Sequence, residues 1–263
     1  MKVVHFFFNM STQLFIFCGL LITIIVTIDG AASSNLPKGF VPCKKSDPKL
    51  NECIKNGLQI AIPYLAEGVP SVGLIKIDPL RILELKINQE SGRSVNLDLK
   101  FNDIDLFNLK HTQIKSVHYD SVNYNAKIEV LLPESLLLEG NYEANGNVLV
   151  VPIKGKGKCK LAIDISKVDL NVQFKPVERN GNTFMDINNL TITFIATNLN
   201  LQFENLMNAD KALSNNINVF LNENWRDILK ELQPNIEQFM GMALQEISQH
   251  FFNSIPENEI LLA

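Results

Sequence analysis

Residues 222–239 read NENWRDILKELQPNIEQF, and this stretch decides the fold because apolar residues recur at helical spacing straight through Pro234. The stripe extends in both directions at intervals of three or four residues, through Leu213, Ile217, Leu221, Trp225, Ile228, Leu232, Ile236, Phe239, Ala243, Ile247 and Phe251. It predicts one helix from about Ser214 to Asn253, roughly 60 Å long, which Pro234 kinks without ending it. The stripe is too wide and irregular for a coiled-coil seam, so another element must cover it.

The residues before this helix alternate between apolar and polar with a period of two, as antiparallel strands with one wet face do. Residues 122–132, VNYNAKIEVLL, are the clearest case. In residues 94–101, SVNLDLKF, the alternation is equally regular, but its parity changes near Asn102 and Asp103, which predicts a β-bulge. A second change of parity near residues 166–167 indicates that the sheet is strongly curved.

A hairpin is predicted within residues 140–165, GNYEANGNVLVVPIKGKGKCKLAIDI. The dipeptide Asn145-Gly146 is typical of a two-residue turn. Such a turn would place Tyr142 opposite Leu149, on the face that continues along the second strand as an apolar face.

The second strand of this hairpin carries glycines at positions 155 and 157 on its apolar face. They either leave room beside the helix or mark a tight bend. The opposite face carries four alternating lysines, at positions 154, 156, 158 and 160. A phosphate or an anionic membrane could bind them, but GKGK lacks the remainder of a P-loop, so we interpret this face as a solvated strand face.

The N-terminus has the order of a secretory signal peptide: Lys2, an apolar block from Leu14 to Ile28, and small residues ending at Ala32. Cleavage after Ala32 would leave residues 33–263, which we expect to form a single domain because no repeat or linker divides them. The alternative is an uncleaved membrane anchor. No later segment is apolar for long enough to span a bilayer. We therefore expect a secreted, extracellular protein without stable membrane insertion.

After the signal peptide, residues 46–65, SDPKLNECIKNGLQIAIPYL, predict a helix with Asp47 as its N-cap and Pro48 at its first position. Pro63 is the first of several residues expected to break the chain into turns. A bridge between Cys43 and Cys53 would close a short loop and pin the N-terminal arm to this helix.

Cys159 is the odd cysteine of the mature chain. It is either a small buried hydrophobe or a reactive or intermolecular thiol. With three cysteines and no histidines at ligand spacing, we expect no metal site.

The composition argues against nucleic-acid binding and catalysis. The net charge of −4 gives no basic excess to hold a phosphate backbone. The histidines of the mature chain are His111, His118 and His250, and neither G-x-S-x-G nor H-E-x-x-H occurs. His118 beside Asp120 could orient a base, but no motif ties a serine or cysteine to them. We expect neither an enzyme nor a cofactor.

Four motifs, taken in order, resemble a known family. They are CKKSDPKLNEC at 43–53, GVPSVGLIKIDPL at 68–80, GNYEANGNVLVVPIKGKGK at 140–158 and NADKALSNNINVFLNENWRDILKELQP at 208–234. Together they are similar to the takeout and juvenile-hormone-binding protein family of insects, and the similarity spans essentially the whole mature chain.

This resemblance implies an α+β fold in which a strongly curved antiparallel β-sheet is wrapped around one long C-terminal helix, a TULIP-like super-roll. It also implies a short N-terminal helix pinned by a disulfide that matches Cys43 and Cys53, and a tunnel for an apolar ligand. The dedicated hormone carriers of the family have a second disulfide, for which Cys159 has no partner here. The chain is therefore closer to the takeout-like members.

The resemblance and the apolar patterns together nominate a set of ligand-binding residues. Tyr142 matches a position where hormone carriers place a tyrosine hydroxyl against the ligand, although a backbone carbonyl is the commoner partner of a buried tyrosine hydroxyl. The second polar candidate is Tyr124. The expected apolar wall is Trp225, Phe220, Phe239 and Met240, with Phe101, Ile128 and Phe194 opposite. Asn189 begins an N-glycosylation sequon on the exposed parity of its strand.

The function expected from this reading is a secreted, monomeric carrier for a terpenoid hormone, fatty acid or similar lipid, held in a tunnel between sheet and helix. The alternative is an extracellular interaction protein of the same fold, whose tunnel is filled by side chains and whose surface binds a cell-surface receptor or a membrane.

Overall fold

The computed structural model describes residues 36–87, 95–207 and 211–263. The predicted signal peptide, residues 1–32, lies outside the described residues. In chain order the elements are β1 (Cys43–Lys44), α1 (Leu50–Glu67), η1 (Pro70–Val72), β2 (Leu80–Ile87), β3 (Val95–Phe107), η2 (Leu109–His111), β4 (Gln113–Asp120), β5 (Asn125–Leu131), β6 (Leu136–Val148), β7 (Val151–Arg179), β8 (Asn182–Phe203), α2 (Lys211–Glu223), α3 (Trp225–Ser254), α4 (Glu257–Ile260) and β9 (Leu261–Leu262).

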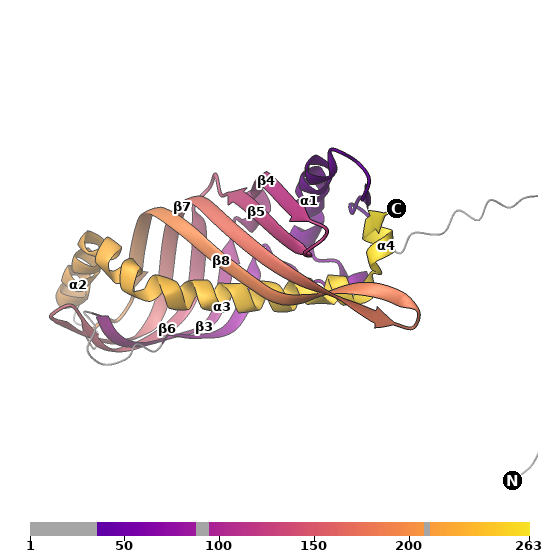
Figure 1. Ribbon diagram of the computed structural model, residues 1–263. Coiled ribbons are helices and arrows are strands. Elements are labelled where there is room, and N and C mark those ends of the chain that lie inside the picture. Colours follow the sequence, from indigo (N-terminus) through magenta and orange to yellow (C-terminus); the bar gives the residue numbers. More distant parts are fainter. Residues whose placement is uncertain (1–35, 88–94, 208–210) are drawn as a thin grey trace, which may run out of the picture. The chain divides into compact units, whose positions relative to one another are not determined.

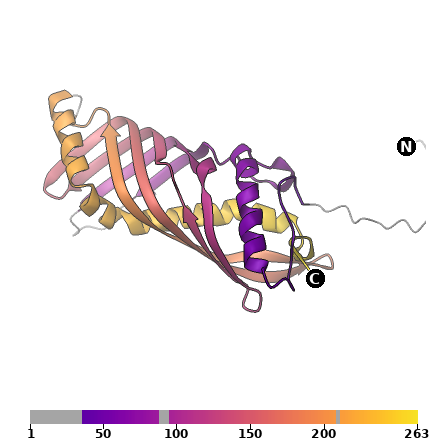
Figure 2. The ribbon, with the colours of Figure 1, turned by 90° about the horizontal axis from the view of Figure 1, so that it is seen from above.

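The described strands β2 to β8 form a seven-stranded antiparallel sheet in the order β2-β3-β6-β7-β5-β4, with β8 on the other side of β7. The long strand β7 pairs with β6 over residues 151–163 and with β5 over residues 168–173. Because β7 changes partner midway, the sheet bends, and its strands arch around α3 (Figures 1 and 2). The predicted α+β fold, a curved antiparallel sheet around a long C-terminal helix, is confirmed.

The apolar stripe of the helices packs against the concave face of this sheet. The largest core cluster joins residues of β3, β6, β7 and β8 to the buried positions Ile217, Leu221, Trp225, Ile228 and Leu232. Burial of these side chains is the main favourable term for the contact. The sheet is therefore the element that covers the stripe.

Both predicted irregularities of the strands are present. The β3–β6 register shifts between Asn102 and Asp105, where Asp103 has a φ of 51°. The β7–β8 register shifts around Ile165 and Lys167. Each shift changes the face to which the following side chains point, which is why apolar parity in the sequence located both.

The predicted hairpin turn at Asn145-Gly146 is wrong. Strand β6 runs through both residues, and the turn to β7 lies at Leu149 and Val150. Tyr142 consequently pairs with Gly157 and not with Leu149. Gly146 has a φ of 145°, and a Cβ there would lie 2.1 Å from the Asn96 carbonyl oxygen. The glycine thus serves a close approach of β3 to β6, not a turn.

The C-terminal helical region is two helices, which corrects the prediction of a single helix. α2 ends at Glu223 and α3 begins at Trp225, while Pro234 lies inside α3 without ending it. At the break, the Asn224 side-chain amide donates to the Phe220 carbonyl at 2.8 Å. The same carbonyl also accepts the Asn224 backbone N–H at 3.1 Å, and α2 turns away from the axis of α3 (Figure 1).

Three local predictions near the N-terminal half also need correction. Asp47 is not the N-cap of α1, because its carboxylate accepts the Lys49 N–H at 2.8 Å in the turn before the helix. Pro63 lies inside α1, which continues to Glu67. Val122 belongs to the β4–β5 turn and is 84% exposed, since the Asp120 carboxylate accepts the N–H groups of residues 122 and 123.

The N-terminal arm is tied down covalently and by polar contacts. The predicted disulfide between Cys43 and Cys53 is present. β1 pairs in parallel with β9, and Lys45 forms an ion pair of 2.7 Å with the buried Glu257 carboxylate. Cys159 is a free, buried thiol, and burial raises its pKa to about 12. This agrees with a small buried hydrophobe and not with a reactive thiol.

Candidate ligand-binding site

The free edge of β8 lies against the two C-terminal helices and is hydrogen-bonded by their side chains. Asn218 accepts the N–H of Phe203 at 2.9 Å and donates to its carbonyl at 2.8 Å. Asn222 does the same with Leu201, at 2.8 Å for both bonds. An edge strand has no neighbouring strand on its outer side. Here the helix side chains bond the backbone groups that such a strand would have bonded.

The same arrangement continues along α3. Gln233 donates to the Phe194 carbonyl at 2.8 Å, and the Glu237 carboxylate accepts the Phe194 N–H at 3.1 Å. Gln245 and Gln249 accept the N–H groups of Leu190 and Ile187. We call these six helix residues the side-chain ladder: Asn218, Asn222, Gln233, Glu237, Gln245 and Gln249.

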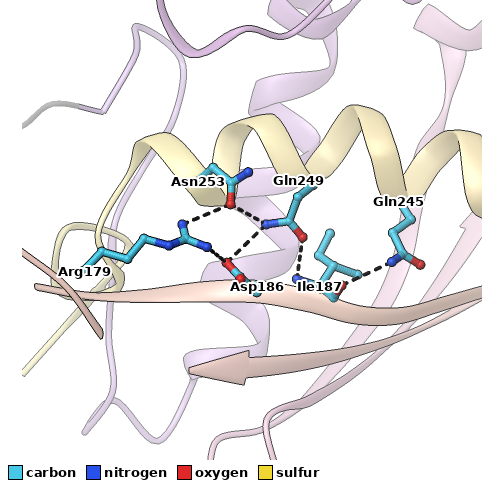
Figure 3. A network of polar contacts seen from close by, with 6 residues as sticks. All are labelled: Arg179, Asp186, Ile187, Gln245, Gln249 and Asn253. Carbon is cyan, nitrogen blue, oxygen red and sulfur yellow. Dashed lines mark hydrogen bonds and ion pairs between the residues drawn. The ribbon is translucent and has the colours of Figure 1, made fainter. Parts of the chain in front are cut away.

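The ladder ends in a polar network at the C-terminal end of α3 (Figure 3). Gln249 accepts the Ile187 N–H at 2.7 Å and donates to the Asn253 side chain at 2.7 Å. Arg179 bridges Asn253, at 3.1 Å, and the carboxylate of Asp186. This network fastens the far end of the β7–β8 hairpin to α3.

A groove of about 470 Å³ opens between α3 and β8 near the start of α3. Its walls include Trp225, Arg226, Leu229 and Lys230 of α3 and Phe194 and Ala196 of β8. Trp225 and Leu229 are buried and belong to the largest core cluster, on which Phe194 and Ala196 pack. Buried core residues therefore form part of the groove's wall, and its volume lies in the range of small-molecule sites.

The structure brings most of the predicted ligand-binding residues to one region. Phe101, Tyr142 and Trp225 belong to the largest core cluster, and Phe194, Phe220 and Phe239 pack against it. Ile128 and Met240 pack in a second cluster, which Phe194 also touches. Tyr124 is separate from both, because it lies in the β4–β5 turn near the disulfide.

The Tyr142 hydroxyl already has a protein partner. It donates to the Glu204 carbonyl at 2.6 Å, and the ring packs edge-on against Phe203 with centroids 4.7 Å apart. Burial raises the pKa of Tyr142 to about 12. A Cβ at Gly155 would lie 2.6 Å from this hydroxyl, and one at Gly157 would lie 2.8 Å from the Glu204 carbonyl. The space beside the two glycines is thus filled by protein, so they serve a close approach of neighbouring atoms and leave no room there.

Sequence reasoning missed the side-chain ladder and the cations of the groove. A signal was present for the ladder, because its members are spaced four residues apart in pairs along one side of the apolar stripe: Asn218 and Asn222, Gln233 and Glu237, Gln245 and Gln249. The cations Arg226 and Lys230 carried no such signal, since exposed charged residues are common on any surface helix.

Residues 19–262 match the model of the family described as Haemolymph juvenile hormone binding protein (JHBP). The chain belongs to this family. The family is one of hydrophobic-ligand binding proteins and not of enzymes, which agrees with the buried apolar residues in the groove's wall. Among the described residues, no helix is both long and apolar enough to cross a bilayer.

Members of the family with known names or structures are similar over most of the chain. The "Circadian clock-controlled protein daywake" of Drosophila melanogaster is 24% identical over 258 residues, which cover 95% of this chain and 96% of that protein. A protein of Schistocerca gregaria whose name proposes β-carotene binding is 23% identical over 218 residues, which cover 82% of this chain and 86% of that protein. The crystal structure of Epiphyas postvittana Takeout 1 is 26% identical, with a TM-score of 0.74, and covers 84% of this chain and 99% of that one.

Proposed function

We propose that the protein is a secreted carrier that holds an apolar or amphipathic small molecule, such as a terpenoid hormone, a fatty acid or a similar lipid, between the sheet and α3. The observation that carries this proposal is the groove. It is lined by Trp225 and Leu229, which are buried in the largest core cluster, and its volume lies in the range of small-molecule sites.

Burial of an apolar chain supplies enough free energy for micromolar binding. Burial of a chain of fifteen methylenes contributes about 12 kcal/mol at about 0.8 kcal/mol each. Micromolar affinity requires only about 8 kcal/mol, which leaves about 4 kcal/mol to offset the lost freedom of the ligand. A carrier of this kind needs few polar contacts.

Secretion and glycosylation are part of the proposal. Asn189 is exposed on β8, as its parity predicted, so a glycosyltransferase could reach it. The disulfide between Cys43 and Cys53 suits an oxidising compartment.

One observation favours the second candidate, an interaction protein with a filled interior. The Tyr142 ring and the backbone at Glu204 occupy the space beside Gly155 and Gly157. Any ligand would therefore have to lie elsewhere along α3, and the groove is one such region.

The carrier is tested with protein secreted from eukaryotic cells. Native mass spectrometry and organic extraction should recover a lipid from it. In delipidated protein, oleic acid or farnesol should change the fluorescence of the single Trp225. Ala196→Phe, which fills the groove, should reduce this response at least about tenfold, because a bulky ring occupies the ligand's volume. Val150→Phe, at an exposed hairpin tip, should leave the response unchanged.

The absence of any co-purifying lipid, together with silence of Trp225 toward every class of lipid tried, would favour the second candidate instead. An equal response of Ala196→Phe and the parent protein would place the ligand away from the groove and would overturn the site while leaving the carrier function standing.

A further inference from the structure

The groove coincides with an interruption of the side-chain ladder. Within residues 36–87, 95–207 and 211–263, no side chain of α2 or α3 hydrogen-bonds the β8 backbone between Phe194 and Leu201. In this interval the β7–β8 register shifts, and the side chains of Thr197 and Asn198 bond to Asp164 of β7 and not to a helix. The helix and the strand are thus tied together at one end of the groove, where Gln233 and Glu237 bond Phe194, and not along the residues that follow Phe194.

The solvent side of the groove is cationic. Arg226 and Lys230 are both exposed and line it together. They are four residues apart, so they lie on the same side of α3. The Arg226 guanidinium lies over the Trp225 ring, 4.5 Å from its centroid. A stacked guanidinium keeps its N–H edge available for a planar acceptor.

Neither cation has an ion-pair partner among the described carboxylates within 4.0 Å. Four other cations, Arg81, Lys100, Lys160 and Lys167, are ion-paired at 2.6 to 3.0 Å. Among the described residues the exposed Lys127, like Arg226 and Lys230, has no such pair. The carboxylate of Glu237 also lines the groove. Its Oε1 is already bonded, because it accepts the Phe194 N–H of β8 and the Gln233 side-chain N–H. Two cations therefore face the opening with one bonded carboxylate beside them.

We propose that the groove selects long-chain carboxylic acids. The carboxylate lies against Arg226 and Lys230, and the chain runs past Trp225, Leu229 and Phe194 into the interior. Charge-assisted bonds from a guanidinium to a carboxylate are the strongest available for such a head group. This inference rests on the proposed carrier function and adds the head-group class of its ligand.

Isothermal titration calorimetry with oleic acid, oleyl alcohol and methyl oleate tests the proposal, with each probe kept below its aggregation concentration. At low salt, oleic acid should bind about tenfold tighter than the other two, since the charge-assisted bonds are lost for a neutral head group. The double variant Arg226→Gln/Lys230→Gln should bind all three equally. Lys127→Gln, an exposed lysine on β5, should keep the preference for the acid.

Two further readouts separate charge recognition from a structural effect. Raising the salt concentration to about 1 M should reduce the preference for oleic acid without lowering the affinity for oleyl alcohol, because screening acts on the charges alone. Circular dichroism and Tm should be unchanged in the double variant, since both side chains are exposed. Rescue of the preference by Arg226→Lys/Lys230→Arg would confirm that charge is the determinant.

The outcomes distinguish the two proposals. Equal binding of acid, alcohol and ester to the parent protein, unchanged in the double variant, would overturn the head-group assignment and leave the carrier function standing. Tighter binding of the acid that persists in the double variant would place the carboxylate elsewhere and would also overturn it. Absence of binding for all three probes would count against the carrier function itself.

Discussion

The hydroxyl of Tyr142 and the backbone carbonyl of Glu204, 62 residues apart in the sequence, are joined by a hydrogen bond of 2.6 Å. The bond links the middle of β6 to the end of β8 across Gly155 and Gly157 of β7. It satisfies the polar group of a nearly fully buried ring. Tyr142 is therefore a structural residue in this conformation, and its role toward a ligand can be tested directly.

Tyr142→Phe should destabilise the fold by about 1 to 3 kcal/mol, because it leaves the Glu204 carbonyl without its donor. Affinity for oleic acid should remain within about twofold, since the hydroxyl is not available to the ligand. Denaturant unfolding and calorimetry measure the two quantities. Tyr119→Phe is the control, with a smaller loss expected because its hydroxyl makes a long bond to the Met185 sulfur, at 3.9 Å. A loss of affinity with unchanged stability would instead assign the hydroxyl to the ligand.

Gly155→Ala should destabilise the protein by about 1 to 3 kcal/mol through overpacking. The new Cβ would lie 2.6 Å from the Tyr142 hydroxyl oxygen and 3.0 Å from the Asn205 carbonyl oxygen. Gly57→Ala in α1 is the matched control, because the nearest atom to its Cβ is 3.5 Å away. It should stabilise the helix by up to about 1 kcal/mol. Urea unfolding measures the stability of both variants. Equal unfolding midpoints for Gly155→Ala and Gly57→Ala would contradict the close approach at Gly155.

Asn222→Ala should accelerate exchange of the Leu201 amide hydrogen, since it removes both side-chain bonds to that residue. Stability should fall by about 2 to 3 kcal/mol as two backbone groups at the edge of β8 lose their partners. Hydrogen exchange read at single-residue resolution measures the first effect. Gln238→Ala, an exposed change on α3, should alter neither quantity. Unchanged protection of Leu201 would show that the ladder contributes nothing to the edge.

Cys159 should resist thiol reagents in the folded protein. With a pKa raised to about 12 by burial, its thiolate fraction at pH 8 is about one in ten thousand. The labelling rate should rise about tenfold per pH unit, because deprotonation of the native thiol is completed only near its raised pKa. Labelling by a chromogenic disulfide measures this rate. Val150→Cys, at a 93% exposed hairpin tip, should react rapidly as the control. Equal rates for the two thiols would contradict the burial of Cys159.

Patterns confined to a few neighbouring residues determined the element types and much of the architecture. Alternation with a period of two identified the strands, and its changes of parity located the irregularities at Asn102 and near Lys167, because a bulge moves the following side chains to the other face. The helical stripe from Leu213 to Phe251 required a broad apolar cover. The order of the four motifs, through the family resemblance, predicted that the sheet wraps around the helix.

Only the tertiary structure decided features that depend on distant partners. Asn145-Gly146 is a turn signal in isolation, but Gly146 is needed for the approach of Asn96, some fifty residues earlier, so the strand continues. The predicted single helix is interrupted at Asn224 and not at Pro234, and the two helices on either side of Asn224 pack differently on the sheet. The groove lies beside the register shift of β8, and Arg226 and Phe194 line it together only after both elements have packed. Such contacts join residues far apart in the chain, and no local pattern encodes them.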